Sequence, residues 1–245
     1  MDKLHSGIDY YLDGNLTRAI KVIEEYISEG GWDLGSAYYH MGLCYNDLGM
    51  HARAGECFIK ATEYAPEKST YHYKLGEAYL SLMVYEKAEK ELETTLKLNP
   101  EHQRARYLLA RAYFQQGNMN KAIELFSNVL STSTEFADAY FYRGLAKYQN
   151  NQEDDALKDL LKALEINPNY SEARLETAKI YETNGKYTEA ENDCNMIYES
   201  GYRSYAFIYF YLNILKRLGK TEQFNVVFDE AISIYPNNQE LENLK

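Results

Sequence analysis

The sequence predicts an all-α solenoid, a stack of repeated helical hairpins, because two ladders of small residues share one period. The first ladder places an alanine every 34 residues, at Ala54, Ala88, Ala122, Ala156 and Ala190. The second holds a glycine or alanine at the same spacing, at Gly42, Gly76, Ala110, Gly144 and Ala178. Two ladders in phase are typical of a tandem array of one unit. Such an array usually offers a binding surface and not a catalytic cavity.

The period divides most of the chain into seven units. Their expected bounds are 1–34, 35–68, 69–102, 103–136, 137–170, 171–204 and 205–238. The first unit fits after a shift of one residue, which places an insertion near Gly30 and Gly31. We expect residues 1–238 to form one domain and residues 239–245 to form a short tail or a partial cap helix.

The first half of each unit predicts one helix followed by a tight turn. A tyrosine follows the small residue of the second ladder by three positions in most units, at Tyr10, Tyr45, Tyr79, Tyr113 and Tyr181. Glycine then recurs at position 15 of the unit, as Gly49, Gly117, Gly185 and Gly219. Glycine at this place favours a left-handed helix end and a turn into a second helix.

The second half of each unit predicts an antiparallel helix that ends at a fixed place. Four residues after the ladder alanine stands a large apolar residue in most units, such as Phe58, Leu92 and Leu160. All four prolines of the chain occupy position 32, at Pro66, Pro100, Pro168 and Pro236. Proline lacks the amide hydrogen and restricts the residue before it, so the helix stops there.

These positions resemble the tetratricopeptide repeat family over nearly the whole chain. The second unit matches its pattern best, at Tyr38, Met41, Gly42, Tyr45, Ala54, Phe58, Ala61 and Pro66. The fifth unit departs from the pattern with Lys147 in place of the tyrosine, and the seventh departs at Leu212, Leu215 and Phe224. The resemblance implies a right-handed α-solenoid superhelix of antiparallel helix-turn-helix repeats, with the first helix of each repeat on its concave side.

The resemblance also implies which residues line a concave groove that binds a peptide or protein ligand. The candidates are Tyr39, His40, Tyr73, Lys74, Arg104, Tyr107, Arg111, Phe114, Phe141 and Tyr142. Tyrosine offers a large contact area with a hydroxyl at its tip, and arginine grips carboxylates, so we expect a ligand with apolar anchors and an acidic group. Two alternatives remain open at this point: the aromatic residues belong to the scaffold, and Glu77 neutralises Arg104 or Arg111.

Composition excludes several other functions. The net charge of −11 and the pI of about 5.0 argue against a nucleic-acid partner. No stretch approaches the roughly 18 apolar residues of a membrane-spanning helix, and no signal peptide is apparent, so we expect a cytoplasmic protein without a membrane partner. The three cysteines lack metal-ligand spacing and are expected to be packing residues in a reducing compartment.

No catalytic constellation, metal site or cofactor motif is present in the sequence, so we expect no enzyme. The leading hypothesis is an adaptor that binds a peptide or protein segment in its groove. A second hypothesis is a scaffold that self-associates end to end through its terminal repeats, because the seventh unit is strongly apolar from Ile208 to Leu215. A third is a receptor that changes shape when it binds a peptide.

Overall fold

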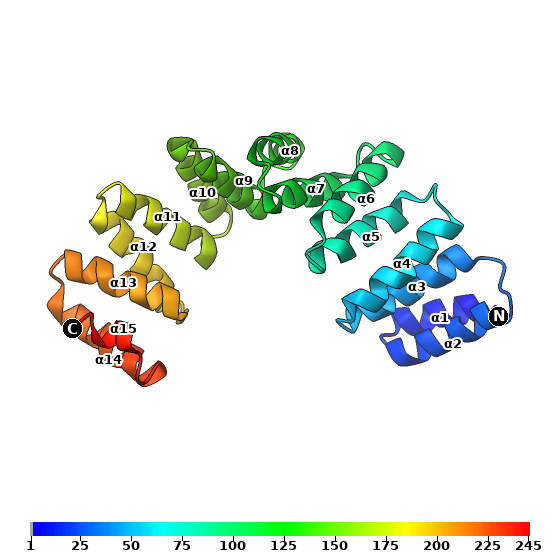
Figure 1. The fold of residues 1–245 in the computed structure, drawn as a ribbon, viewed down its shortest axis with the longest axis horizontal. Coiled ribbons are helices and arrows are strands. Elements are labelled where there is room, and N and C mark those ends of the chain that lie inside the picture. The colour runs from blue at the N-terminus through cyan, green and yellow to red at the C-terminus, as the bar shows by residue number, and fades with distance from the viewer. Residues whose placement is uncertain (1) are drawn as a thin grey trace. The chain divides into compact units, whose positions relative to one another are not determined.

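Helices alone build this chain. The structure, a computed structural model, describes residues 2–245, and over that range it contains fifteen helices and no strand. The helices divide into two compact units, Met1–Val129 and Leu130–Lys245. Figure 1 shows the helices in chain order, and each predicted repeat contains two of them. That the repeats act together as one domain stays a prediction.

Four hairpins contribute to the first unit. Their helices are α1 (Lys3–Leu12), α2 (Leu16–Ser28), α3 (Leu34–Asp47), α4 (His51–Tyr64), α5 (Ser69–Ser81), α6 (Tyr85–Leu98), α7 (Gln103–Gln115) and α8 (Met119–Thr132). The second helix of one hairpin packs against the first helix of the next, as α2 does on α3, α4 on α5 and α6 on α7. First helices also touch directly, α1 on α3 and α5 on α7. The first unit is therefore a stack of hairpins in which first helices adjoin one another.

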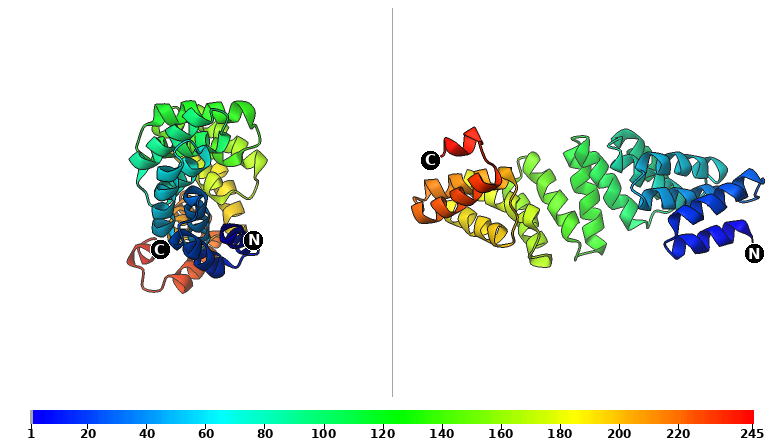
Figure 2. Two further views of the ribbon diagram at one scale, coloured as in Figure 1. Left: turned by 90° about the vertical axis from the view of Figure 1, so that its right-hand side faces the viewer. Right: turned by 90° about the horizontal axis from the view of Figure 1, so that it is seen from below.

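The second unit repeats this arrangement and ends in a short extra helix. Its helices are α9 (Ala137–Gln149), α10 (Glu153–Ile166), α11 (Ser171–Thr183), α12 (Tyr187–Glu199), α13 (Tyr205–Arg217), α14 (Thr221–Ile234) and α15 (Gln239–Glu242). Each hairpin packs on the next, and the turned views of Figure 2 show successive hairpins side by side within the unit.

Close approach of the two helices in a hairpin explains both ladders of small residues. The five alanines of the first ladder are completely buried. A Cβ atom at Gly42 would lie 2.5 Å from Phe58 Cε1, and one at Gly76 would lie 2.7 Å from Leu92 Cγ. The large residue of the second helix thus fills the space that the glycine leaves open, as the sequence predicts.

Position 15 adopts a left-handed backbone conformation whether or not it is glycine. The φ angles of Gly49 and Gly117 are +73° and +81°. Met83 and Asn151 hold the same position in the third and fifth repeats, and both have a φ angle of +58°. The turn geometry is therefore set by the hairpin, and two repeats adopt it without the residue that it favours.

The departure of the fifth repeat from its pattern has a structural reason. Lys147 lies 2.8 Å from a carboxylate oxygen of Asp159, which is almost completely buried on α10. Arg143, one turn earlier on α9, binds both oxygens of the same carboxylate with distances of 2.7 Å. The tyrosine is thus replaced by a cation that helps to neutralise a buried aspartate.

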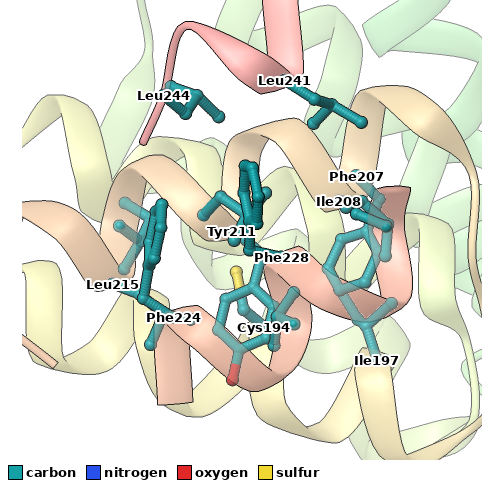
Figure 3. Packing of buried hydrophobic residues seen from close by; sticks show 14 of the residues in the cluster. Cys194, Ile197, Phe207, Ile208, Tyr211, Leu215, Phe224, Phe228, Leu241 and Leu244 are labelled. Atoms are coloured by element: carbon teal, nitrogen blue, oxygen red, sulfur yellow. The ribbon is translucent and has the colours of Figure 1, made fainter. Parts of the chain in front are cut away.

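The C-terminal segment, residues 239–245, contains the short helix α15 and packs on the last hairpin. Leu241 and Leu244 are buried against the core of the last hairpin, and Figure 3 shows both side chains directed toward the residues of α13 and α14. Lys216 Nζ donates a hydrogen bond of 2.7 Å to the Leu244 carbonyl and holds the segment in place.

The apolar residues of the seventh repeat are internal. Five of them are buried, namely Ile208, Tyr211, Leu212, Ile214 and Leu215. These side chains form the core of the last repeat, and residues 239–245 cover part of that core. They are therefore not the exposed apolar surface on which the hypothesis of end-to-end self-association was based.

Candidate peptide-binding surface

The first unit carries most of the predicted site residues on three consecutive first helices. Tyr39 lies on α3, Tyr73 on α5 and Tyr107 on α7, each at the same position of its repeat. Only 8% of Tyr73 and 7% of Tyr107 is exposed, and the Tyr39 ring stacks on Tyr71 with 4.7 Å between centroids. The rings of this tyrosine row, Tyr39, Tyr73 and Tyr107, are therefore part of the scaffold, and a ligand would meet mainly their edges.

Lys74 is neutralised within its own helix. Its Nζ atom lies 2.7 Å from Glu77 Oε2, and the Tyr73 hydroxyl donates to Glu77 Oε1 at 3.3 Å. Burial, followed by the charge of Glu77, raises the pKa of Tyr73 to about 12. Glu77 thus pairs with Lys74, a partner that the sequence analysis did not consider, so Lys74 adds little net positive charge to this surface.

Arg104 is the exposed cation next to this cluster. It stands at the start of α7, and its positive charge opposes the rise in the pKa of Tyr73. Tyr39 also senses Glu77, since burial and then that carboxylate raise its pKa. The structure therefore brings Tyr39, Tyr73, Lys74, Glu77 and Arg104 together, from three different helices.

Arg111 and Phe114 lie farther along α7. The Arg111 guanidinium lies 6.0 Å from the centroid of the Tyr107 ring, on the edge of the range for a cation–π contact. Arg111 and Phe114 are both half-buried. They extend the surface along α7, with less of each side chain available to a ligand than at Arg104.

His40 is half-buried and bonded within its own helix. Its Nδ1 atom lies 2.8 Å from the carbonyl oxygen of Ser36, one turn earlier on α3. Burial lowers the pKa of His40 below its ordinary value. It therefore contributes a ring at the edge of the tyrosine row and no positive charge at neutral pH.

Phe141 and Tyr142 belong to the second unit, on α9. Phe141 is 8% exposed, and its ring lies 5.1 Å from that of Tyr142 and 4.9 Å from that of Tyr170. Phe141 is thus a core residue of its own repeat, and Tyr142 is the more accessible of the two.

The three cysteines are buried thiols. Cys44, Cys57 and Cys194 are all buried and free, and burial raises the pKa of Cys44 and Cys57 to about 11. Over residues 2–245, no group of three or more His, Cys, Asp or Glu side chains is placed to hold a metal ion. Within the same range no helix has the length and apolar character needed to cross a membrane.

Sequence reasoning missed two features of these surfaces. The Lys74–Glu77 pair has the i,i+3 spacing that brings charges together on a helix, so that spacing could have revealed it. The partner of Lys147 could not be found in this way, because Asp159 lies on the other helix of the hairpin.

The family models that match this chain all describe one family. Models described as tetratricopeptide repeat match residues 35–68, 84–148, 137–170 and 160–192, which together cover more than half of the chain. No curated protein sequence matches at a significant level.

Solved structures of low sequence identity share the fold. A tetratricopeptide repeat protein from Parabacteroides merdae is 19% identical with a TM-score of 0.73, and the match covers 99% of this chain and 96% of that one. The pilF protein of Pseudomonas aeruginosa is 18% identical with a TM-score of 0.73, over 86% and 96% of the two chains.

A third solved structure is YrrB, described as a TPR protein with an unusual peptide-binding site. It is 23% identical with a TM-score of 0.66, over 70% of this chain and 88% of that one. The repeated helical hairpins, the buried ladders and the matching family models lead to one conclusion: this chain belongs to the tetratricopeptide repeat family.

Proposed function

We propose that this protein is a non-catalytic adaptor that binds a peptide or protein segment on the first-helix face of its first unit. The observation that carries the proposal is Arg104, an exposed arginine beside a row of buried and half-buried tyrosines, while its neighbour Lys74 is already paired with Glu77. The family assignment supports a role in protein–protein interaction. The peptide-binding site named for YrrB is a property of that protein and agrees with this direction.

The rigid tyrosine rings lower the entropic cost of binding. The rings of Tyr39 and Tyr73 are fixed by stacking and burial before any ligand arrives, so little side-chain entropy is lost on association. Arg104 offers a planar fork that binds a carboxylate with two parallel hydrogen bonds. The expected ligand is therefore a segment with apolar anchors and one acidic group close to them.

The test compares two charge reversals of equal size. The variant Lys74→Glu/Arg104→Glu changes the proposed surface, and Lys90→Glu/Lys97→Glu makes the same change on exposed positions of α6 in the same unit. A partner purified from the native lysate with wild-type protein is titrated against all three by calorimetry. We expect the surface variant to bind at least about tenfold more weakly and the control to bind like wild type. Unchanged binding by the surface variant, with helicity intact, would place the site elsewhere.

Single substitutions then separate the two cations. Because Lys74 is neutralised by Glu77, Arg104→Ala should weaken binding more than Lys74→Ala. An equal or opposite ranking would mean that the ligand breaks the Lys74–Glu77 pair. The shape-changing receptor stays an untested hypothesis.

A further inference from the structure

A second candidate surface lies in the second unit, on the second helices of two repeats. A depression of about 440 Å³ runs between α12 and α14, the second helices of two consecutive repeats. Asn195, Tyr198 and Glu199 line it from α12, and Glu222, Gln223 and Val226 line it from α14. We call it the α12/α14 groove. It contains none of the residues of the first-helix surface.

Exposed apolar side chains accompany this groove. Val226 is 65% exposed, and Met196, on the α12 turn that precedes Glu199, is 50% exposed. Val226 lines the groove, and Met196 follows the lining residue Asn195 on α12. The exposed side chain of Val226 can therefore receive an apolar side chain of a ligand.

Polar residues at the base of the groove are already fixed. Gln223 Nε2 donates to Asn195 Oδ1 at 2.8 Å and to the Tyr211 hydroxyl at 2.6 Å. The Tyr211 hydroxyl in turn donates to Asn195 Oδ1. Because this network joins α12, α13 and α14, the groove is formed before any ligand binds and needs no rearrangement.

The charge of the groove is negative and uncompensated. Glu199 and Glu222 are exposed and line it, and Asp229 lies seven residues after Glu222 on the same face of α14. Among the described residues, none of these three carboxylates has a hydrogen bond or ion pair. The neighbouring carboxylates do: Glu191 lies 3.2 Å from Lys220, and Glu230 lies 2.8 Å from Arg203.

The chain itself shows how an arginine is held at this place. The Arg203 guanidinium lies 3.7 Å from the centroid of the Tyr198 ring, while its Nε atom donates to Glu230. Tyr198 also lines the groove. An aromatic ring combined with a carboxylate is thus an arrangement that already binds a guanidinium at the edge of the α12/α14 groove.

We propose that the α12/α14 groove docks a basic segment of a partner protein, in which lysine or arginine side chains flank an apolar residue. The cations would lie against Glu199, Glu222 and Asp229, and the apolar residue against Val226, with Met196 as a neighbouring reporter on α12. This complementarity disfavours nucleic acids and anionic lipids, which the three carboxylates repel. An adaptor with this second surface would hold two partners of opposite charge, one on each unit, so this inference extends the proposed function without depending on it.

The direct test follows the Met196 methyl group by NMR in full-length protein with carbon-13 in its methionine methyl groups. The probe is a short, end-capped peptide that combines lysine and arginine with leucine, and a matched peptide has glutamate in place of each cation. We expect the basic peptide to shift the Met196 signal in a saturable way, while Met50 and Met83 of the first unit stay unchanged. The acidic peptide should shift none of the three. A Met196 signal that does not respond to the basic peptide would overturn the proposal.

Charge-neutral variants separate the groove from the general attraction of an acidic protein for a basic peptide. Glu199→Gln/Glu222→Gln removes two carboxylates from the groove, and Glu63→Gln/Glu86→Gln removes two exposed carboxylates of the first unit. We expect the groove variant to bind about fivefold to tenfold more weakly than wild type and the control variant to stay within about twofold.

Equal weakening by both variants would mean that net charge alone attracts the peptide and would contradict a groove. A Met196 shift that depends on protein concentration in the absence of peptide would instead identify a second copy of this chain as the occupant, and would also contradict the proposal.

Discussion

At the scale of single residues, the buried aspartate of the fifth repeat carries the clearest energetic consequence. Asp159 is 5% exposed and forms ion pairs with both Arg143 and Lys147, whose side chains are 17% exposed. Removing the carboxylate is costly because both cations have lost most of their hydration and would keep no negative partner in this cluster.

Asp159→Ala should therefore lower the free energy of unfolding by about 3 kcal/mol, since it leaves two poorly hydrated cations side by side. Asp155→Ala, one turn earlier on α10, is the matched control, because Asp155 is exposed and forms its ion pair with the exposed Lys158. Urea unfolding followed by circular dichroism measures both. A loss for Asp159→Ala no larger than that of the control would show that the three-charge cluster is unimportant for stability.

Burial of single side chains also limits how the tyrosine row can contact a ligand. Tyr39, Tyr73 and Tyr107 lie on first helices at the same position of their repeats, but their rings are held largely inside the stack. In the proposed function, the polar groups around them, Lys74, Glu77 and Arg104, would therefore determine the affinity for a ligand.

At the scale of elements, the turn between the two helices of a repeat is the most constrained part of the chain. Five repeats place glycine at its left-handed position, whereas the third uses Met83 and the fifth uses Asn151. Asparagine tolerates this conformation because its short polar side chain bonds locally, but methionine has no such compensation. Met83 is also 73% exposed, so it gains little packing in return.

Met83→Gly should stabilise the protein by about 0.5–1 kcal/mol, because relief of the left-handed conformation exceeds the extra chain entropy of glycine. Asn151→Gly has the same backbone geometry and should give a clearly smaller gain. Thermal unfolding of the two variants beside wild type measures the difference. The opposite ranking, or a loss of stability in Met83→Gly, would show that contacts of the methionine side chain stabilise the protein by more than its left-handed conformation costs.

At the scale of the whole molecule, each hairpin is stabilised by contacts with its neighbours, so the apolar core of a terminal hairpin must be covered by another segment. In the second unit Leu241 and Leu244 supply it by packing on the core of α13 and α14, as Figure 3 shows. The segment has only one short helix, yet both of its leucines are buried.

Leu241→Asp/Leu244→Asp should cost about 2–4 kcal/mol, because two buried apolar side chains are replaced by charged ones. It should also expose the apolar core of the last repeat and make the protein self-associate. Gln239→Asp/Asn243→Asp adds the same two charges at exposed positions of the segment and should do neither. Calorimetry and sedimentation velocity at increasing concentration measure the two effects. If the wild-type protein self-associates as strongly as the leucine variant, the result would contradict this prediction and support the hypothesis of an end-to-end scaffold.

The sequence by itself determined the family, the helical hairpin and the position of nearly every helix. It could do so because these properties depend on contacts that recur every 34 residues: a small residue at a crossing, a glycine at a turn and a proline at a helix end. The periodicity averages over seven copies, so single exceptions such as Lys147 did not obscure it.

Only the tertiary structure decided which charges are free and which apolar residues are covered. Lys74 pairs with Glu77, Lys147 with Asp159, and the leucines of the last segment with the seventh repeat. These contacts occur once each and join different helices or compete with other partners, so no repeat pattern records them. The fold follows from what the repeats share, whereas the candidate binding surfaces follow from the residues in which they differ.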